Sequence, residues 1–299
     1  MPGFGNPESK AAAAEQVQYV KMPGGIAEII LNRPEKRNAL SVPMRDRITA
    51  LIHAAERDVE VSVLIFRGVG KAFCSGNEIN EDWGQRDASK RRFTLSDAYR
   101  YGSDMTYGRQ AFSQALGRTS LITIVQLHGF CAAAAYFMIA TRCDVVIATE
   151  DSKIGAIEGR FLGPAGAVSH IHLNRILGTK AARRLGYTAE PMSGREALEL
   201  GLVSECLADE EALRAAVLRR AGELAKRSTV ELKYLKARIC AAESLLGVSM
   251  PAMSGLLFSH FFKSEPDELD FWKAVKSGGV ATALAEDKAR KAALRGDGE

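Results

Sequence analysis

The sequence predicts an α/β fold, in which buried strands alternate with helices and a mostly helical region follows. Three short apolar runs rich in β-branched residues, at residues 61–67, 121–127 and 144–148, are typical of strands that lie inside a sheet. Stretches with helical periodicity lie between and after them. The chain has 299 residues, 46% of them hydrophobic, which is enough to bury the core of such a fold.

A β-hairpin and a helix are the first elements that the sequence predicts. Apolar and polar residues alternate at 17–21 and 26–31, on either side of a turn segment with Pro and two Gly at 22–25. Ser41 precedes a segment of helical periodicity, and Pro43 suits its first turn. The side chains expected on the buried face of this helix are Met44, Ile48, Leu51 and Ile52.

The later elements are predicted to be mainly helical. The most apolar stretch, residues 130–149, contains Arg142 and Asp144, so it predicts a buried helix followed by a strand rather than a membrane span. Ser193 and Glu196 form a capping box at the start of a short helix. The longer helices expected after it are at residues 210–226 and 230–246.

These patterns divide the chain into three parts. We expect a flexible tail at residues 1–16, a core that holds the active site at 17–205, and a helical C-terminal region at 206–299. The polar stretch between Glu78 and Thr119 is expected to contain helices and a mobile loop.

Composition argues against several classes of function. The net charge is +4 with 25% charged residues and no strong basic patch, so binding to nucleic acid is not expected. The five cysteines show no metal-ligand spacing, which predicts neither a disulfide framework nor a zinc site. Cysteines of this kind suit a reducing cytosol, so we expect a cytoplasmic protein. The first residues lack the apolar segment of a secretion signal and predict a frayed tail, and no membrane partner is expected.

One acid and two segments of small residues form the candidate active site. Glu158 ends an apolar approach at residues 154–157. The segments 71–78 and 128–135 each predict a strand that runs into a tight helix start, where small residues expose backbone N–H groups. Two N–H groups that converge on one point stabilise an oxygen that gains negative charge, and a nearby carboxylate then moves protons on the substrate. This combination predicts enolate chemistry.

Four motifs in order carry a family resemblance. They are Ile29-Ile30-Leu31-Asn32-Arg33-Pro34 with Arg37-Asn38-Ala39-Leu40, Lys71-Ala72-Phe73 with Ser75-Gly76-Asn77-Glu78, Gly129 with the alanine run 132–135, and Ser193-Gly194-Arg195-Glu196-Ala197 with Gly201-Leu202-Val203. Together they resemble the crotonase family, the enoyl-CoA hydratase and isomerase superfamily. The resemblance implies a spiral of ββα units, a helical C-terminal region that builds trimers or dimers of trimers, and an acyl-CoA thioester substrate.

The resemblance also implies roles for individual residues. The backbone N–H groups of Asn77 and Ala134 are expected to meet the thioester oxygen, and Glu158 is expected to act as general acid and base. Coenzyme A enters as part of the substrate, and no metal or redox cofactor is expected. The residues expected to bind the substrate are Arg37, Ala39, Glu78, Ile79, Asn80, Trp83 and Phe137.

One position departs from the family's pattern. Hydratases of this family use two glutamates, and Phe137 falls where the first is expected. A single carboxylate can move a proton between two carbons, whereas hydration also requires a positioned water. Mechanism therefore favours isomerisation of a 3-enoyl to a 2-enoyl thioester, while the frequency of activities in the family favours hydration. Hydrolysis or decarboxylation of an oxo-acyl-CoA stays open as well.

Other interpretations compete with these assignments. Glu158 is alternatively a surface acid in a weak pair with Arg160. For His128, a hydrogen bond to the backbone is favoured over a role as a base, and for Cys74 and Cys131 packing is favoured over nucleophilic catalysis. As a whole, the chain is alternatively a protein that binds acyl-CoA without turning it over, or an RNA-binding relative.

Overall fold

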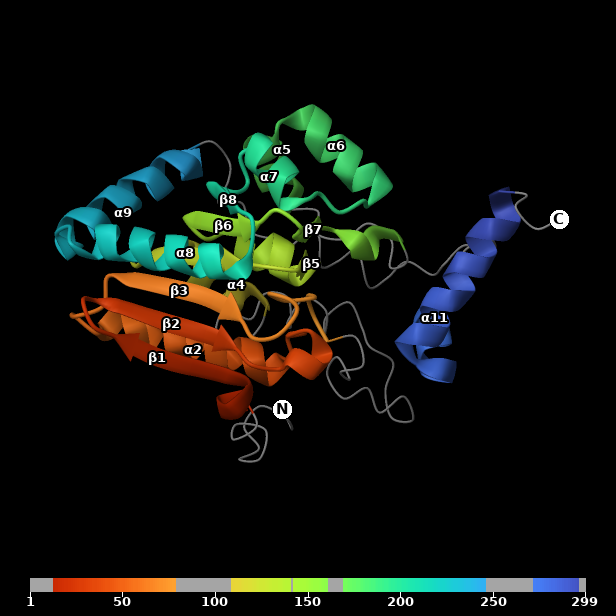
Figure 1. Ribbon diagram of the computed structural model, residues 1–299, viewed down its shortest axis with the longest axis horizontal. Coiled ribbons are helices and arrows are strands. Elements are labelled where there is room, and N and C mark those ends of the chain that lie inside the picture. The colour runs from red at the N-terminus through yellow and green to blue at the C-terminus, as the bar shows by residue number, and fades with distance from the viewer. Residues whose placement is uncertain (1–12, 79–108, 141, 161–168, 246–270, 296–299) are drawn as a thin grey trace.

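A mostly parallel sheet forms the centre of the structure (Figure 1). The computed structural model describes residues 13–78, 109–140, 142–160, 169–245 and 271–295. In this sheet the strand order is β1-β2-β3-β4-β6-β8. The first two strands pair antiparallel as the predicted hairpin, and the others pair in parallel. The strands are β1 (Val17–Met22), β2 (Ile26–Leu31), β3 (Val63–Gly68), β4 (Ile122–Leu127), β6 (Val145–Thr149) and β8 (Glu205–Leu207).

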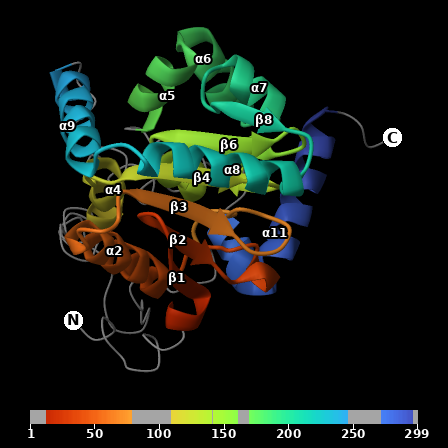
Figure 2. The same ribbon diagram turned by 60° about the vertical axis from the view of Figure 1, so that its left-hand side comes forward.

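Alternate side chains of the central strands face two different helical layers. In β3, Leu64 and Phe66 belong to the apolar cluster that includes residues of α2 and α4, whereas Val63 and Ile65 belong to the cluster that includes residues of α8. Successive side chains of a strand point to opposite faces, so this predicted apolar run is buried on both sides. Figure 2 shows α2 and α8 on different sides of the sheet. The helices are α2 (Val42–Arg57), α4 (Arg109–Arg118) and α8 (Glu210–Ala225).

Serine caps begin two of the predicted helices. Ser41 Oγ accepts a hydrogen bond from Met44 N at 3.3 Å at the start of α2, whose buried face contains the four apolar residues expected there. Ser193 Oγ accepts from Glu196 N at 3.1 Å before α7 (Gly194–Glu199), as the capping box predicts. The Glu196 carboxylate is paired with Arg184 of α6 (Thr179–Thr188).

A second sheet of two strands carries the chain toward the candidate site. β5 (Phe130–Ala132) and β7 (Lys153–Gly155) pair in parallel. β5 leads into η2 (Ala135–Ala140), a π-helix, and β7 leads into η3 (Ile157–Arg160), a 3₁₀-helix. The predicted buried helix followed by a strand is confirmed as η2 followed by β6, and the helix is of the π type. Because parallel strands end at the same edge of their sheet, η2 and η3 both follow that edge.

The remaining helices lie outside the two sheets. α5 (Ser169–Leu177) and α6 (Thr179–Thr188) follow the site, and Figure 1 shows α9 (Thr229–Leu245) and α11 (Phe271–Arg295) at opposite ends of the molecule. Among the described helices, none combines the length and apolar character needed to cross a membrane. β8 pairs with β6 across the predicted boundary between residues 205 and 206, and α8 packs against the main sheet. The predicted division into a core at 17–205 and a C-terminal region at 206–299 stays a prediction.

Candidate active site

Backbone pairing holds the segment at residues 71–78 against the segment at 128–135. Cys74 N donates to Phe130 O at 2.9 Å, and Ala132 N donates to Cys74 O at 3.1 Å. These bonds form a short parallel bridge between the two segments. The two small-residue segments predicted to build the site are therefore neighbours in space.

Gly76 allows the first segment to approach the start of η2 closely. Its φ is +102°, a value that side-chain-bearing residues rarely adopt. A Cβ atom at this position would lie 2.6 Å from Ala133 Cβ and 3.2 Å from Ala134 N. The peptide that joins Gly76 to Asn77 can therefore come near the Ala134 N–H only because residue 76 has no side chain.

Asn77 lies directly after this approach and is bridged to Leu40. Leu40 N donates to Gly76 O at 2.7 Å, and Glu78 N donates to Leu40 O at 3.0 Å. In this parallel pattern the N–H of the central residue, Asn77, points away from the bridged segment. Within the described part of the chain, neither Asn77 nor Ala134 donates its N–H to a backbone oxygen. Both predicted oxyanion donors thus have the capacity to bind a ligand.

The Asn38 side chain holds the backbone ahead of Gly76. It is fully buried, and its Nδ2 donates to Val69 O at 3.0 Å, Ala72 O at 2.8 Å and Phe73 O at 3.2 Å. Its φ is +56°, in the left-handed region that Asn tolerates better than most residues. In the sequence, Asn38 stands out only as part of a motif, because its partners lie in a distant segment.

Two arginines hold the side chains beside the predicted oxyanion donors. Arg45 of α2 is buried and donates from Nη1 to Asn77 Oδ1 at 2.7 Å. Arg33 Nη1 lies 2.9 Å from Glu78 Oε2, and the two side chains are only 16% and 12% exposed. Glu78, predicted to bind substrate, is thus paired with Arg33. Neither arginine was predicted as a site residue, since the sequence does not show which distant side chain each one meets.

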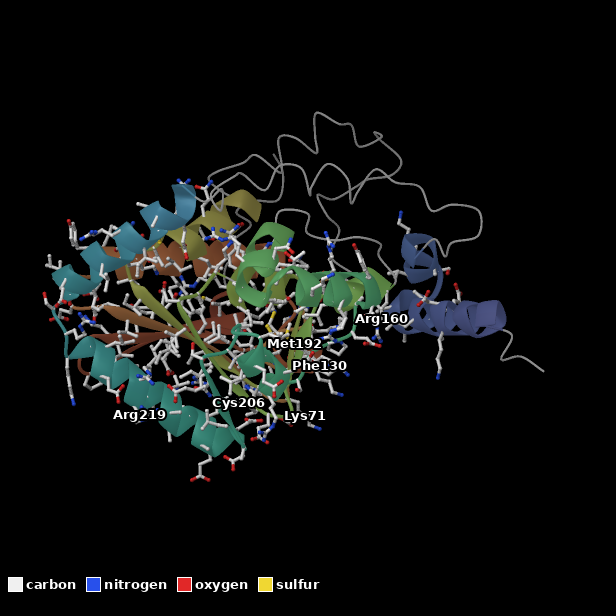
Figure 3. All side chains as sticks on the ribbon, turned by 90° about the horizontal axis from the view of Figure 1, so that it is seen from above. Lys71, Phe130, Arg160, Met192, Cys206 and Arg219 are labelled. Atoms are coloured by element: carbon white, nitrogen blue, oxygen red, sulfur yellow. The ribbon has the colours of Figure 1, made fainter. Side chains whose placement is uncertain are left out.

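Positive charge gathers around Phe130 at the outer side of β5. The Arg37 guanidinium lies 5.6 Å from the centre of the Phe130 ring, and Lys153 Nζ lies 5.5 Å from it. Figure 3 shows Lys71 near Phe130 as well. Arg37 is exposed, while Ala39, in the same loop, is buried. This loop therefore places one predicted substrate-binding residue, the charged Arg37, in solvent near the same aromatic ring as Lys153.

Glu158 is buried, and one of its carboxylate oxygens has no partner among the described residues. Its exposed fraction is 6%, and the oxygen without a hydrogen bond is Oε2. Burial raises the pKa of this carboxyl from 4.5 to about 7, against the opposing effect of the residue's own backbone N–H. The interpretation of Glu158 as an exposed acid in a weak surface pair is therefore wrong.

η2 contributes two buried aromatic side chains near Glu158. Tyr136 is 1% exposed and Phe137 is 6% exposed, and their ring centres lie 5.1 Å apart with the planes at 45°. Burial raises the pKa of Tyr136, and electrostatic interactions with Cys131 and Glu158 raise it further. Tyr136 was not predicted as a site residue. The signal that could have identified it is the one hydroxyl in the helical run 135–140.

The two cysteines and the histidine in these segments have the structural roles that the sequence favours over catalysis. Burial raises the pKa of the Cys74 thiol to about 12 and that of Cys131 well above its usual value, so both thiols stay protonated near neutrality. His128 Nε2 lies 2.7 Å from Gly70 O, which is the backbone hydrogen bond expected for this residue. The predicted substrate-binding residues Ile79, Asn80 and Trp83 lie outside the described residues.

Known proteins share both the sequence pattern and the architecture. A family model described as "Enoyl-CoA hydratase/isomerase" matches residues 21–268. The Bos taurus "Enoyl-CoA hydratase domain-containing protein 2, mitochondrial" is 30% identical over 256 residues, which cover 83% of this chain and 82% of the relative. The "Hydroxycinnamoyl-CoA hydratase-lyase" of Pseudomonas fluorescens is 26% identical over 217 residues, which cover 73% of this chain and 75% of the relative.

A solved structure supports the same conclusion at the level of the fold. The crystal structure of an enoyl-CoA hydratase from Mycobacterium smegmatis matches with a TM-score of 0.77 and 26% sequence identity. The match covers 92% of this chain and 93% of that chain. The α/β architecture with a mostly parallel sheet is therefore that of the crotonase-fold hydratases. From the family match over most of its length, this chain belongs to the enoyl-CoA hydratase/isomerase family.

Proposed function

We propose that this protein acts on an acyl-CoA thioester through an enolate, with Asn77 and Ala134 N–H groups as the oxyanion hole and Glu158 as general acid and base. The observation that carries the proposal is the buried Glu158 carboxyl, whose pKa lies near neutrality. A carboxyl whose pKa is strongly shifted by burial is a candidate functional acid. Family membership supports the acyl-CoA substrate.

The two N–H groups stabilise the negative charge that develops on the thioester oxygen. Both belong to backbone that neighbouring segments hold in place, through Leu40 for Asn77 and through the start of η2 for Ala134. Donors that are already oriented require little rearrangement when the enolate forms, and removing one such donor typically lowers kcat by roughly 10²–10³. Fixed backbone geometry therefore supports enolate formation more than any side chain in these segments does.

Glu158 exchanges protons with the carbon skeleton. Near neutral pH a carboxyl with a pKa of about 7 is present in both forms, so one group can remove a proton and return it. Isomerisation of a 3-enoyl thioester uses this directly: Glu158 removes a proton from C2, the double bond moves, and the proton is returned at C4. The apolar Phe137 side chain is compatible with this reaction, which needs no water.

Hydration of a 2-enoyl thioester is the second candidate reaction. The bovine relative and the M. smegmatis structure carry the name enoyl-CoA hydratase, and the P. fluorescens relative is named as a hydratase-lyase. If water is added here, another group must hold it together with Glu158, because Phe137 offers no hydrogen bond. Hydrolysis or decarboxylation of an oxo-acyl-CoA proceeds through the same kind of enolate and is the third candidate.

The coenzyme A part of the substrate is proposed to lie along the loop that contains Arg37 and Ala39. Arg37 and Lys153 both lie close to the Phe130 ring, 5.6 Å and 5.5 Å from its centre, and neighbouring cations of this kind attract phosphate groups. Reversing the charge of Arg37 should therefore raise KM for acyl-CoA more than it lowers kcat. No other cofactor is part of this proposal.

Self-association as a trimer or a dimer of trimers is also proposed. α9 exposes a row of apolar side chains, among them Val230 at 77%, Tyr234 at 65% and Ile239 at 51%. Contiguous exposed apolar surface is typical of a protein interface. Size-exclusion chromatography with light scattering tests this proposal: a mass of three or six chains supports it, and a stable monomer contradicts it.

Incubation with trans-2-enoyl-CoA and with 3-enoyl-CoA in D₂O separates the candidate reactions. Mass spectrometry follows the products and the deuterium that enters them. Conversion of the 3-enoyl thioester without hydration identifies an isomerase, and rapid formation of 3-hydroxyacyl-CoA identifies a hydratase. Tight acyl-CoA binding without deuterium exchange favours the non-catalytic alternative, and strongly salt-dependent RNA binding favours an RNA-binding relative.

Two matched variants test the role of Glu158. Glu158→Gln should abolish deuterium exchange at the α-carbon and leave acyl-CoA affinity nearly unchanged, because the side chain keeps its shape and loses its titratable group. Glu190→Gln, at an exposed acid after α6, should leave both properties unchanged. Exchange that persists in Glu158→Gln contradicts the acid/base assignment.

A further inference from the structure

Two buried side-chain oxygen atoms near the candidate site have no hydrogen-bond partner among the described residues. They are the Tyr136 hydroxyl and Glu158 Oε2, on side chains that are 1% and 6% exposed. Buried side-chain polar atoms in native proteins are nearly always hydrogen-bonded, so such exceptions ask for a physical explanation. One explanation is that both atoms bind the same ligand.

The topology brings these two atoms to one region. Ala132 at the end of β5 lies opposite Gly155 at the end of β7, and the parallel strands then run into η2 and η3. Tyr136 lies in η2 and Glu158 in η3, each shortly after its strand. The charge of Glu158 raises the pKa of Tyr136, which places the two groups within electrostatic range of each other. Each group therefore lies in the helix that follows one of two paired strand ends.

The π-helical form of η2 is the second feature of this region. A π-helix accommodates an additional residue in a turn, and such turns are frequent at functional sites. The turn contains Tyr136 and Phe137, whose rings pack with centres 5.1 Å apart. One of the two is apolar throughout, and the other carries a hydroxyl. The polar group that Phe137 cannot supply is thus present on the adjacent side chain.

The chemistry of the two groups defines what they bind. Tyr136 remains protonated at neutral pH, because burial and nearby charge both oppose its ionisation, and it is therefore a hydrogen-bond donor. The Glu158 carboxylate is an acceptor. A single oxygen atom that accepts one hydrogen bond and donates another satisfies both groups. Water and an alcohol have this property, whereas an alkene or an alkyl chain does not.

We propose that Tyr136 and Glu158 together bind the oxygen atom that hydration adds to C3 of the acyl group, as water before the reaction and as the 3-hydroxyl after it. This inference rests on the proposed enolate function and selects hydration among its candidate reactions. It assigns to Tyr136 the role of holding the reacting oxygen. Phe137 then lines the acyl chain beside it.

The step can be written with all atoms balanced. The Glu158 carboxylate removes a proton from the water, the water oxygen bonds to C3, and the electrons of the C2–C3 double bond move toward the thioester oxygen. The Asn77 and Ala134 N–H groups stabilise the resulting enolate. Glu158 then delivers its proton to C2, which restores the thioester and the carboxylate. Tyr136 donates a hydrogen bond to the oxygen throughout and keeps its own proton.

Tyr136→Phe tests the inference through the balance between two reactions of the same enzyme. Hydration of trans-2-enoyl-CoA should fall relative to α-proton exchange by about tenfold or more, as expected when a hydrogen bond to the reacting oxygen is lost. The preference for 3-hydroxybutyryl-CoA over butyryl-CoA, measured by calorimetry, should fall by about fivefold or more. The melting temperature should not decrease, because the variant removes a buried hydroxyl without a partner.

Tyr19→Phe is the matched control. Tyr19 is partly buried in β1, the edge strand of the six-stranded sheet, so this variant removes a hydroxyl outside η2. It should change neither the ratio of hydration to α-proton exchange nor the preference for 3-hydroxybutyryl-CoA over butyryl-CoA. An unchanged ratio in Tyr136→Phe, or a parallel fall of both reactions with a lower melting temperature, overturns the inference and makes Tyr136 structural.

The same experiment separates this inference from the proposed function. A wild-type enzyme that exchanges α-protons but adds no water overturns the role of Tyr136 and leaves the enolate function standing. A wild-type enzyme with no exchange, or a Glu158→Gln variant that keeps it, contradicts the proposed function itself. Hydration that is lost in Glu158→Gln and selectively weakened in Tyr136→Phe supports both.

Discussion

Neutralising Glu158 should stabilise the fold, and the gain should grow with pH. Burial raises the pKa of this carboxyl from 4.5 to about 7. Each pH unit of such a rise corresponds to about 1.36 kcal/mol, so ionised Glu158 lowers the free energy of unfolding by on the order of 3 kcal/mol. Glu158→Gln keeps the size of the side chain and removes this penalty.

The direction of the pH dependence follows from the raised pKa. Well below pH 4.5 the carboxyl is protonated in both the folded and the unfolded chain, and its titration makes no difference to stability. Between pH 4.5 and about 7 the unfolded chain releases the proton while the folded chain keeps it, so wild-type stability falls as pH rises. Above about pH 7 both states are ionised and the penalty is constant.

Urea unfolding of the wild type and Glu158→Gln at several values from pH 4.5 to 8 measures this effect. The stability of the variant minus that of the wild type should increase by about 3 kcal/mol across this range and level off above neutrality. Comparing the difference at several pH values removes any constant cost of burying the amide. Glu190→Gln should show a constant difference. If the Glu158→Gln difference is also constant, burial does not control this carboxyl and the reasoning fails.

The backbone geometry of the site gives further testable outcomes. Gly76→Ala should lower deuterium exchange by about tenfold or more and destabilise the fold by about 1–3 kcal/mol, because the new Cβ meets Ala133 Cβ at 2.6 Å and φ is +102°. The control is Gly222→Ala in α8, where the new Cβ meets open space, and it should keep activity and be neutral or stabilising by up to about 1 kcal/mol. Equal effects of the two variants contradict the close approach of Gly76 to Ala133 and Ala134. Asn38→Ala should cost about 1–3 kcal/mol in urea unfolding, since it leaves buried backbone carbonyls without their donor. The pH profile of kcat/KM should rise with an apparent pKa near 7, and a flat profile between pH 6 and 8 contradicts Glu158 as the base.

Much of the fold could be predicted because its signals are local. The hairpin at β1 and β2 follows from alternation around a turn, and α2 follows from Ser41 and a stripe of apolar residues at helical spacing. The buried strand β3 follows from a β-branched run that is apolar on both faces. Each of these signals depends on residues a few positions apart, which is the range over which backbone geometry acts.

The candidate site could be predicted only where a motif marks it. Asn77 and Ala134 were predicted from the family resemblance and Glu158 from its apolar approach and its place in the motif, and the structure places the two small-residue segments against each other. Asn38 and Arg45 were not assigned a role, although their side chains hold the first segment. Their partners lie in other elements, and a polar residue in the sequence does not reveal which distant atom satisfies it.

The sequence by itself determined the family, the hairpin, α2 and the buried central strands, and the presence of an acid that follows two segments of small residues. Only the tertiary structure decided that η2 is a π-helix, that Tyr136 and Glu158 lie beyond the ends of paired strands, and that burial raises the pKa of Glu158. The physical reason is that helix periodicity and turn chemistry are properties of neighbouring residues. Burial, by contrast, depends on how distant segments pack, and burial controls both the charge of an acid and the partners left to a hydroxyl.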